Sequence, residues 1–210
     1  GTKGKGSTAA MITAILTAQG YKTGLYTSPA LHSVVERIRV GLEPIARADF
    51  ATLVERIWPD AGWVAENGDH GDVTFFEFIT AMAFLHFAQI GADFQVIEVG
   101  LGGRLDATNV LNPVVSVITP IMLDHVAILG DTVDLIAAEK AGIIKQGVPV
   151  VTAPQVPAAL DVLIQVAAER GARLVRVGDD VQWQERESSL DGQSFDISGR
   201  LDVYNIQTSL

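Results

Sequence analysis

The sequence predicts an α/β fold in which helices cover both faces of a mostly parallel sheet, and two observations support this. Short β-branched runs alternate along the chain with longer helical patterns, an alternation typical of parallel strands joined by helical crossovers. The runs are continuously apolar, without a polar residue at every second position, which indicates strands buried on both faces. We therefore expect a three-layer α/β/α domain.

Short segments rich in β-branched residues and bounded by turn residues are predicted to be strands. They are residues 25–27, 95–99, 114–119, 148–152 and 174–177. The pattern changes after residue 178, where short antiparallel strands are expected around turns such as Asp191-Gly192. These are residues 181–186, 194–197 and 201–206. We expect one domain over 1–210, with a parallel core at 1–178 and an antiparallel extension at 179–210.

Apolar periodicity and end signals predict helices between the strands. They are residues 7–19, 48–57, 75–90, 132–144 and 157–170. In the first, Met11, Ile12, Ile15 and Leu16 form the expected buried stripe. The second is expected to end before Pro59, because proline breaks helices. The third is apolar on most faces but too short for a bilayer, which needs roughly 20 apolar residues, so we expect a buried helix.

Composition excludes several classes of protein. Hydrophobic residues make up 48% and charged residues 19% of the chain, which is too apolar for a disordered chain. Fifteen Lys and Arg against 25 Asp and Glu give a net charge of −10, so we expect no nucleic-acid partner. The chain has no cysteine, which excludes disulfides and zinc thiolate sites. No signal peptide opens it, and we expect a cytoplasmic protein without a membrane partner.

A glycine-rich segment, Gly1-Thr2-Lys3-Gly4-Lys5-Gly6-Ser7-Thr8, opens the chain directly before the first helix. Glycines allow successive N–H groups to face one anion, and the helix N-terminus adds unpaired donors. Lys5 can reach terminal phosphates, and a hydroxyl can face them or a metal. The spacing departs from a strict P-loop because Gly6 separates Lys5 from Ser7. The residues alone therefore allow a phosphate loop or a flexible glycine-rich terminus.

Further motifs follow the opening in a fixed order. They are GLYTSP at 24–29, ERI at 36–38, FEF at 76–78, EVGLGGRLDATN at 98–109, LDH at 123–125 and EKAGII at 139–144. With the opening, they resemble the folylpolyglutamate and dihydrofolate synthases of the Mur ligase superfamily. The resemblance implies the central, P-loop-type ATP-binding domain of a ligase that uses ATP and Mg²⁺.

The reaction implied by this resemblance joins L-glutamate to a folate or dihydropteroate carboxylate through an acyl phosphate. It also implies a monomer. Members of this family have a segment before the phosphate loop and a C-terminal domain, and both are absent from these 210 residues. We therefore expect that this chain alone does not catalyse ligation at a useful rate.

The resemblance also implies roles for individual residues. The implied ATP-binding residues are Gly1, Thr2, Gly4, Lys5, Gly6, Ser7 and Thr8. The implied magnesium ligands are Ser28, Glu98, His125 and, once carbamylated, Lys140. Lys5, His125 and Lys140 are the implied catalytic residues. The implied substrate-binding residues are Thr27, Pro29, Arg37 and Arg104.

The residues themselves leave other interpretations open for these positions. Ser28 precedes a proline and is typical of a turn, and Glu98 can be a buried glutamate paired with a lysine or arginine. His125 can be a structural or exposed histidine, with Asp124 placed to fix its tautomer. Lys140, next to Glu139, is typical of a charged helix surface. The loop at 102–109 can be purely structural, with Asp106 capping the next turn.

Three positions depart from the family pattern. Lys3 stands where asparagine is typical, Ala30 where histidine is frequent, and Val35 where asparagine is frequent.

Three other functions remain open. One alternative is a Mur-type ligase acting on a cell-wall nucleotide peptide. Another is a catalytically inactive nucleotide-binding or interaction module. A P-loop switch GTPase has the least support, because the sequence has no motif that reads guanine.

Overall fold

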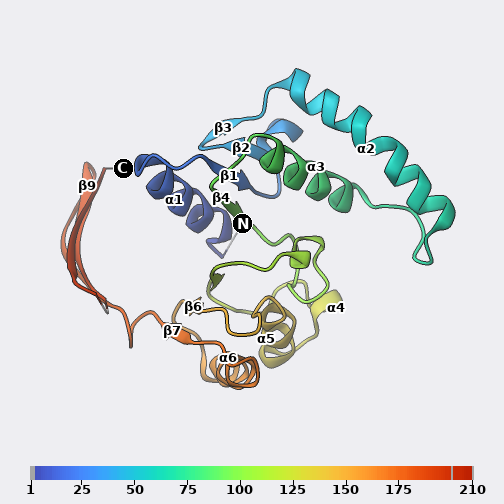
Figure 1. Cartoon of the computed structure of the whole chain (residues 1–210). Coiled ribbons are helices and arrows are strands. Elements are labelled where there is room, and N and C mark those ends of the chain that lie inside the picture. Colours follow the sequence, from blue (N-terminus) through green and yellow to red (C-terminus); the bar gives the residue numbers. More distant parts are fainter. Residues whose placement is uncertain (1–2, 200, 210) are drawn as a thin grey trace. The chain divides into compact units, whose positions relative to one another are not determined.

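The computed structural model describes residues 3–199 and 201–209, and the chain divides into two compact units, Gly1–Leu111 and Asn112–Leu210 (Figure 1). Each unit contains parallel strands flanked by helices, which confirms the predicted α/β class. Among the described residues, no helix has the length and apolar character needed to cross a membrane.

The first unit is built on a four-stranded sheet of order β3-β2-β1-β4. The central strands β1 (Thr23–Tyr26) and β4 (Phe94–Ile97) are parallel, as predicted. The edge strands β2 (Ile38–Val40) and β3 (Glu43–Pro44) are antiparallel to their neighbours and were not predicted. Residues 38–40 and 43–44 (IRV and EP) include charged residues and a proline, and they lack the continuously apolar run from which the other strands were predicted.

Helices α1 (Lys5–Ala18) and α3 (Phe75–Gln89) lie on opposite sides of the central strands (Figure 1). Side chains alternate along β1, and Gly24 and Tyr26 face α3. A Cβ added at Gly24 would lie 2.5 Å from a ring carbon of Phe87. The ring of Phe87 therefore packs directly on the bare backbone of β1, and this close approach requires glycine.

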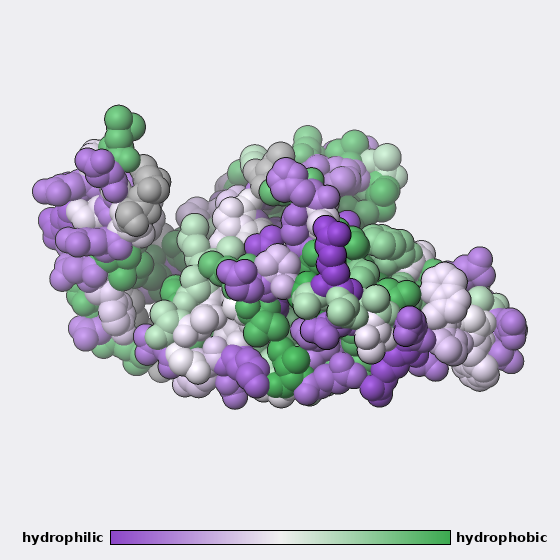
Figure 2. Space-filling model, turned by 90° about the horizontal axis from the view of Figure 1, so that it is seen from above, coloured by the Kyte–Doolittle hydropathy of each residue, from purple (hydrophilic) through white to green (hydrophobic). Residues whose placement is uncertain are grey.

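The apolar stripe predicted for α1 is wrong in part. Ala9 and Thr13, four residues apart and therefore on one face, are the buried residues of this helix. Met11 and Ile15 are 64% and 65% exposed. The helix packs on the sheet through its small side chains, which allow a closer approach than methionine would. Hydrophobic and hydrophilic residues are interspersed on the face of the protein shown in Figure 2.

Helix α2 (Arg47–Asn67) continues through Pro59, so the predicted end before this proline is wrong. Proline has no N–H and cannot bond to the carbonyl of Glu55, four residues earlier. One missing bond does not end the helix, because the turns on both sides keep their own bonds. At the C-terminus, Nδ2 of Asn67 donates to the carbonyl of Trp63 at 2.9 Å and closes the last turn.

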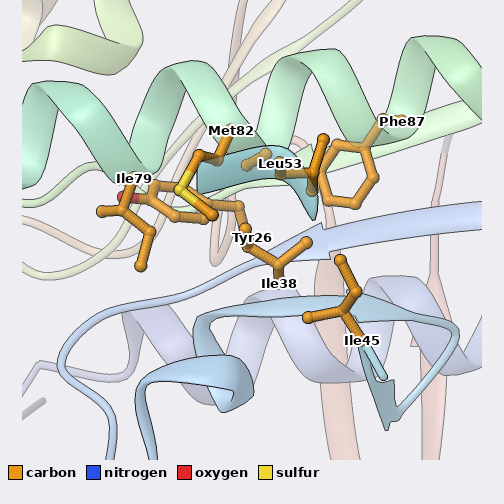
Figure 3. Close-up of a cluster of buried hydrophobic side chains, with 8 residues drawn as sticks. Tyr26, Ile38, Ile45, Leu53, Ile79, Met82 and Phe87 are labelled. Carbon is orange, nitrogen blue, oxygen red and sulfur yellow. The ribbon is translucent and has the colours of Figure 1, made fainter. Parts of the chain in front are cut away.

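A cluster of buried side chains fills the space between the sheet and helices α2 and α3 (Figure 3). Its members are Tyr26, Ile38, Ile45, Leu53, Ile79, Met82, Ala83 and Phe87. Helix α3 contributes half of them, which confirms the prediction that this apolar helix is buried rather than membrane-spanning. Tyr26 is the one member with a polar group, and its hydroxyl needs a partner inside the core.

The second unit contains a parallel sheet of order β5-β6-β7, again as predicted. Its strands are β5 (Ser116–Ile118), β6 (Val150–Thr152) and β7 (Leu174–Arg176). Its helices are α4 (Val126–Leu129), α5 (Val133–Ala141) and α6 (Pro157–Glu169). Helix α5 packs on α6. The first strand is shorter than predicted, because Val114 and Val115 lie before it and are exposed.

An antiparallel sheet of order β10-β9-β8 ends the chain, as predicted, although its strands are longer than expected. They are β8 (Gln182–Ser189), β9 (Gly192–Ser198) and β10 (Val203–Ser209). On one face, Asp196 accepts hydrogen bonds from Arg186 and Asn205. On the other face, Trp183, Ile197 and Tyr204 lie in register across the three strands.

Candidate functional site

The glycine-rich opening leads into the N-terminus of α1. Gly1 and Thr2 lie outside the described residues. Gly4 has φ +79°, a left-handed conformation that glycine adopts readily, and its carbonyl accepts the amide of Thr8 at 2.9 Å. The helix therefore begins at Lys5, two residues earlier than predicted.

The start of α1 has donors to offer to an anion. Within the described part of the chain, no side chain caps this helix, and its first turn carries no acidic residue. The first amides of a helix have no acceptor inside the helix, and here they include those of Gly6 and Ser7. Together with the charge of Lys5, these donors suit a phosphate group. The geometry favours the phosphate-loop interpretation of the opening.

Glu98 lies directly after β4 and is only 5% exposed. Its amide donates to the carbonyl of Tyr26 at 2.9 Å, next to the last residue pair of the parallel ladder, Tyr26 with Ile97. Its Oε2 accepts the amide of Ser28 at 3.0 Å. Burial raises the pKa of the Glu98 carboxyl, while the Ser28 hydrogen bond and the charge of Lys5 act in the opposite direction. A buried carboxylate beside a cationic loop is a common feature of functional sites.

Gly6 lies beside this carboxylate. A Cβ at this position would be 3.4 Å from Oε2 and 3.6 Å from Oε1 of Glu98. A side chain would therefore occupy the space directly against both carboxylate oxygens. This contact explains why glycine follows Lys5, at the position where the sequence departs from a strict P-loop.

The donors gathered here fit magnesium bound together with a nucleotide. The carboxylate of Glu98 and the hydroxyl of Ser28 are hard oxygen ligands, which Mg²⁺ prefers. Among the described residues, no group of three or more His, Cys, Asp or Glu side chains forms a metal cage. Magnesium in nucleotide sites commonly uses one or two carboxylates, several waters and the phosphates themselves, so one buried carboxylate beside a phosphate loop is a suitable donor set.

His125 and Lys140 belong to the second unit. His125 adopts the left-handed conformation, with φ 49°, immediately before α4. Its Nε2 lies 3.7 Å from Oδ1 of Asp124, which is an ion-pair distance and too long for the hydrogen bond expected to fix its tautomer. Lys140 is half-buried in the last turn of α5.

The segment after β1 is ordered by hydrogen bonds to one carboxylate. The short helix η1 (Val34–Arg37) has a capping box in which Glu36 takes part. The Glu36 carboxylate accepts the amides of Leu31 and Ser33, both at 3.0 Å. These backbone hydrogen bonds hold the pKa of Glu36 below its usual value.

The proposed substrate-binding residues of this segment take part in its packing. The amide of Thr27 donates to the carbonyl of Arg37 at 3.1 Å. The Arg37 guanidinium carbon lies 5.3 Å from the ring centroid of Phe75, a cation–π distance. Pro29 is exposed and follows a cis peptide bond. The first unit thus brings Thr27 and Arg37 close to the end of β1 that carries Ser28.

Asp106 holds the loop at 102–109 through hydrogen bonds, as predicted if this aspartate caps the next turn. Asp106 caps η2 (Ala107–Val110) and accepts the amides of Leu101 at 2.8 Å and Thr108 at 3.0 Å. Arg104 is exposed in this loop. The structure confirms the cap, and the role of Arg104 toward a substrate stays a prediction.

Two residues near the site were missed by the sequence reasoning. Tyr26 is fully buried, and its hydroxyl lies 3.0 Å from Oγ1 of Thr80 in α3. The signal available was a tyrosine in an apolar strand, which needs a polar partner when buried. The position of that partner, 54 residues away, cannot be inferred from local pattern.

Comparison with known proteins gives the family. A family model described as the Mur ligase middle domain matches residues 1–210. The dihydrofolate synthase/folylpolyglutamate synthase of Bacillus subtilis is 42% identical over 212 residues, which cover 100% of this chain and 49% of that protein. The chain therefore spans about half the length of the curated relatives it matches.

Solved structures agree in fold. The apo form of folylpolyglutamate synthase (FPGS) from Lacticaseibacillus casei matches with a TM-score of 0.92 and 39% identity, over 99% of this chain and 51% of that chain. A structure described as an FPGS-AMPPCP-folate complex matches with a TM-score of 0.92 and 40% identity, over the same shares of both chains. The α/β core and the antiparallel C-terminal strands therefore occur together in solved proteins. This chain belongs to the Mur ligase middle-domain family.

Proposed function

We propose that the chain is the nucleotide-binding part of an ATP-dependent ligase that joins L-glutamate to a folate or dihydropteroate carboxylate. The convergence of Lys5, Gly6 and Ser28 on the buried carboxylate of Glu98 carries this proposal. The 42% sequence identity to a dihydrofolate synthase/folylpolyglutamate synthase and the structural similarity to an FPGS-AMPPCP-folate complex support it.

In this proposal the opening loop and the start of α1 bind the phosphates of ATP. Amides of residues 4–7 donate to the phosphate oxygens, and the ammonium group of Lys5 binds the β- and γ-phosphates. Gly1, Thr2 and Thr8 are further proposed ATP-binding residues. Gly6 keeps the space between the phosphates and Glu98 free of a side chain.

Ser28 and Glu98 would hold one magnesium ion, and His125 and carbamylated Lys140 would serve a second metal position. The metal supplies positive charge that offsets the repulsion between the substrate carboxylate and the γ-phosphate. Glu98 is buried, and its hydrogen bond from Ser28 fixes the direction of one carboxylate oxygen. That fixed oxygen is ready to bind a cation without reorganisation.

The proposed reaction has two steps. A carboxylate oxygen of the folate attacks the γ-phosphorus and ADP leaves, which gives an acyl phosphate. The amino group of glutamate then attacks the acyl carbon, inorganic phosphate leaves and the amine loses a proton. Thr27, Pro29, Arg37 and Arg104 are the proposed substrate contacts. We propose that the protein acts as a cytoplasmic monomer.

Calorimetry with the non-hydrolysable analogue AMPPCP tests the nucleotide site directly. We expect the 210-residue chain to bind AMPPCP with Mg²⁺ and to lose binding when Mg²⁺ is chelated. Lys5→Ala should abolish binding, whereas Lys3→Ala, a matched lysine in the same loop, should retain it. Absence of magnesium-dependent binding in the unmodified chain would contradict the proposal and favour an inactive interaction module.

The same titration separates the proposal from a ligase for cell-wall precursors. With AMPPCP and Mg²⁺ saturating, we expect dihydropteroate or folate to bind and a uridine-nucleotide peptide not to bind. The opposite preference would assign the chain to the other branch of the family.

A further inference from the structure

The hydroxyl of Tyr26 has a defined place in a buried hydrogen-bond chain. Tyr26 and Thr80 are 0% and 2% exposed, and their hydroxyl oxygens are 3.0 Å apart. The Thr80 hydroxyl donates to the carbonyl of Phe76 at 2.7 Å. A threonine hydroxyl has one proton, so the Tyr26 hydroxyl must be the donor to Thr80. The ring of Tyr26 lies beside Ile79 and Met82 of α3 (Figure 3).

Arg37 also interacts with the Tyr26 hydroxyl. Burial raises the pKa of Tyr26, whereas the charge and hydrogen bond of Arg37 lower it. Arg37 is itself held over the ring of Phe75 at 5.3 Å. The Tyr26 hydroxyl therefore interacts with residues of both η1 and α3.

Hydrogen bonds of backbone amides connect Tyr26 with Ser28 and Glu98, the two proposed magnesium ligands, which we call the Ser28–Glu98 pair. The carbonyl of Tyr26 accepts the amide of Glu98 at 2.9 Å. Two residues after Tyr26, the amide of Ser28 donates to Oε2 of Glu98 at 3.0 Å. A shift of Tyr26 would therefore move both partners of this pair, the Glu98 backbone and the Ser28 amide.

We propose that Thr80 is a positioning residue, which fixes the end of β1 through the Tyr26 hydroxyl and so sets the Ser28–Glu98 pair for magnesium nucleotide. Thr80 has this role although it lies in a helix and touches neither the loop nor Glu98 in any described contact. The inference rests on the proposed function for its consequence in nucleotide binding. Its structural part, the coupling of Thr80 to the Ser28–Glu98 pair, is testable without any ligand.

Matched variants isolate the hydroxyl. Thr80→Val keeps the shape of the side chain but leaves the buried Tyr26 hydroxyl without its acceptor, whereas Thr80→Ser keeps the acceptor. Thr13→Val is the control, because Thr13 is also 0% exposed and donates the same type of helix bond, to the carbonyl of Ala9 at 2.8 Å. Thr13 lies in α1 and is not part of the Tyr26 chain. Tyr26→Phe provides a second variant if Thr80→Val does not fold.

Amide hydrogen exchange in the ligand-free chain is the first measurement. We expect the amides of Ser28 and Glu98 to exchange about fivefold faster in Thr80→Val, as loss of one buried hydrogen bond allows. Thr80→Ser and Thr13→Val should leave these two amides unchanged. Equal acceleration in Thr80→Val and Thr13→Val, or none in Thr80→Val, would overturn the proposal.

The magnesium dependence of AMPPCP binding is the second measurement. The Mg²⁺ concentration for half-maximal binding should rise about fivefold in Thr80→Val and return to the original value in Thr80→Ser. If the unmodified chain does not bind AMPPCP, the proposed function fails, and the exchange rates still decide the positioning role. If Thr80→Val showed normal amide exchange at Ser28 and Glu98 and a normal magnesium dependence, the positioning role of Thr80 would be refuted. The proposed function would not be affected by that result.

Discussion

The backbone amide of Ser28 donates a 3.0 Å hydrogen bond to Oε2 of Glu98, 70 residues further along the chain. The bond joins the carboxyl ends of two neighbouring parallel strands, β1 and β4. In open α/β sheets, ligands bind at this edge. The N-terminus of α1 lies beside this bond, because a Cβ added at Gly6 would lie 3.4 Å from the same carboxylate oxygen.

Glu98→Gln should stabilise the ligand-free protein at neutral pH. Burial raises the folded pKa of Glu98 above its unfolded value, so this group contributes stability below the unfolded pKa that is lost as pH rises through the folded pKa. Glutamine does not ionise, so the variant avoids this loss of stability, and its side-chain oxygen can still accept the hydrogen bond from the Ser28 amide. In urea unfolding, the advantage of the variant should grow from about pH 4 to pH 7.

Glu77→Gln is the control of opposite sign. Hydrogen bonds from Thr74 lower the pKa of Glu77, so its contribution is present above the unfolded pKa and is lost as pH falls. The Glu77 variant should therefore be less stable than the original at neutral pH and approach it in acid. Parallel behaviour of the two variants would contradict the environment described for Glu98.

Gly6→Ala should weaken magnesium-dependent AMPPCP binding by about tenfold, a typical effect of disturbing the surroundings of a metal ligand. The added methyl group occupies the space 3.4 Å from Oε2 of Glu98. Stability should not fall, because alanine is the better helix former by about 0.5–1 kcal/mol. Calorimetry and thermal unfolding of the same sample separate the two effects.

Gly62→Ala gives the comparison for this substitution. Gly62 lies within α2, and a Cβ there meets nothing within 4 Å. It should gain similar helix stability and bind nucleotide normally. Equal loss of binding in both alanine variants would show that the space beside Glu98 is not the cause.

Thr74→Ala should destabilise the protein by about 1 kcal/mol. The Glu77 amide donates to the Thr74 hydroxyl at 3.3 Å, and the Thr74 amide donates to Glu77 Oε2 at 2.8 Å. This capping box starts α3, the helix that supplies half of the buried cluster. Thr74→Ser keeps the cap, so its midpoint in chemical unfolding should stay near the original. A midpoint for Thr74→Ala equal to that of Thr74→Ser would argue against the cap.

The order of strands and helices follows from the sequence, because long periodic segments and β-branched runs carry a strong local signal. What the sequence leaves open depends on the surroundings. In the sequence, Pro59 indicates the end of a helix, but α2 continues because it tolerates the loss of one backbone hydrogen bond. The spacing of Met11 and Ile15 predicts a buried stripe, but the small side chains of Ala9 and Thr13 are buried in their place.

The site was predictable in part for the same reason. The end of an apolar strand is the predicted position of Glu98, and the structure confirms that Glu98 directly follows β4 at the carboxyl edge of the parallel pair. The approach of Gly6 to this carboxylate and the bond from Tyr26 to Thr80 join distant segments. Such long-range contacts leave no local pattern, so only the folded chain reveals them.

The packing of Phe87 on Gly24 has a consequence for how this fold can change over time. The phenyl ring occupies the volume that any side chain at position 24 would need, so a side chain at position 24 alone causes a clash, and a smaller residue at position 87 alone leaves a cavity. A branched or larger residue at position 24 is tolerable only together with a smaller one at position 87. Among relatives, these two positions should therefore covary as a pair, 63 positions apart in sequence but occupying one shared volume.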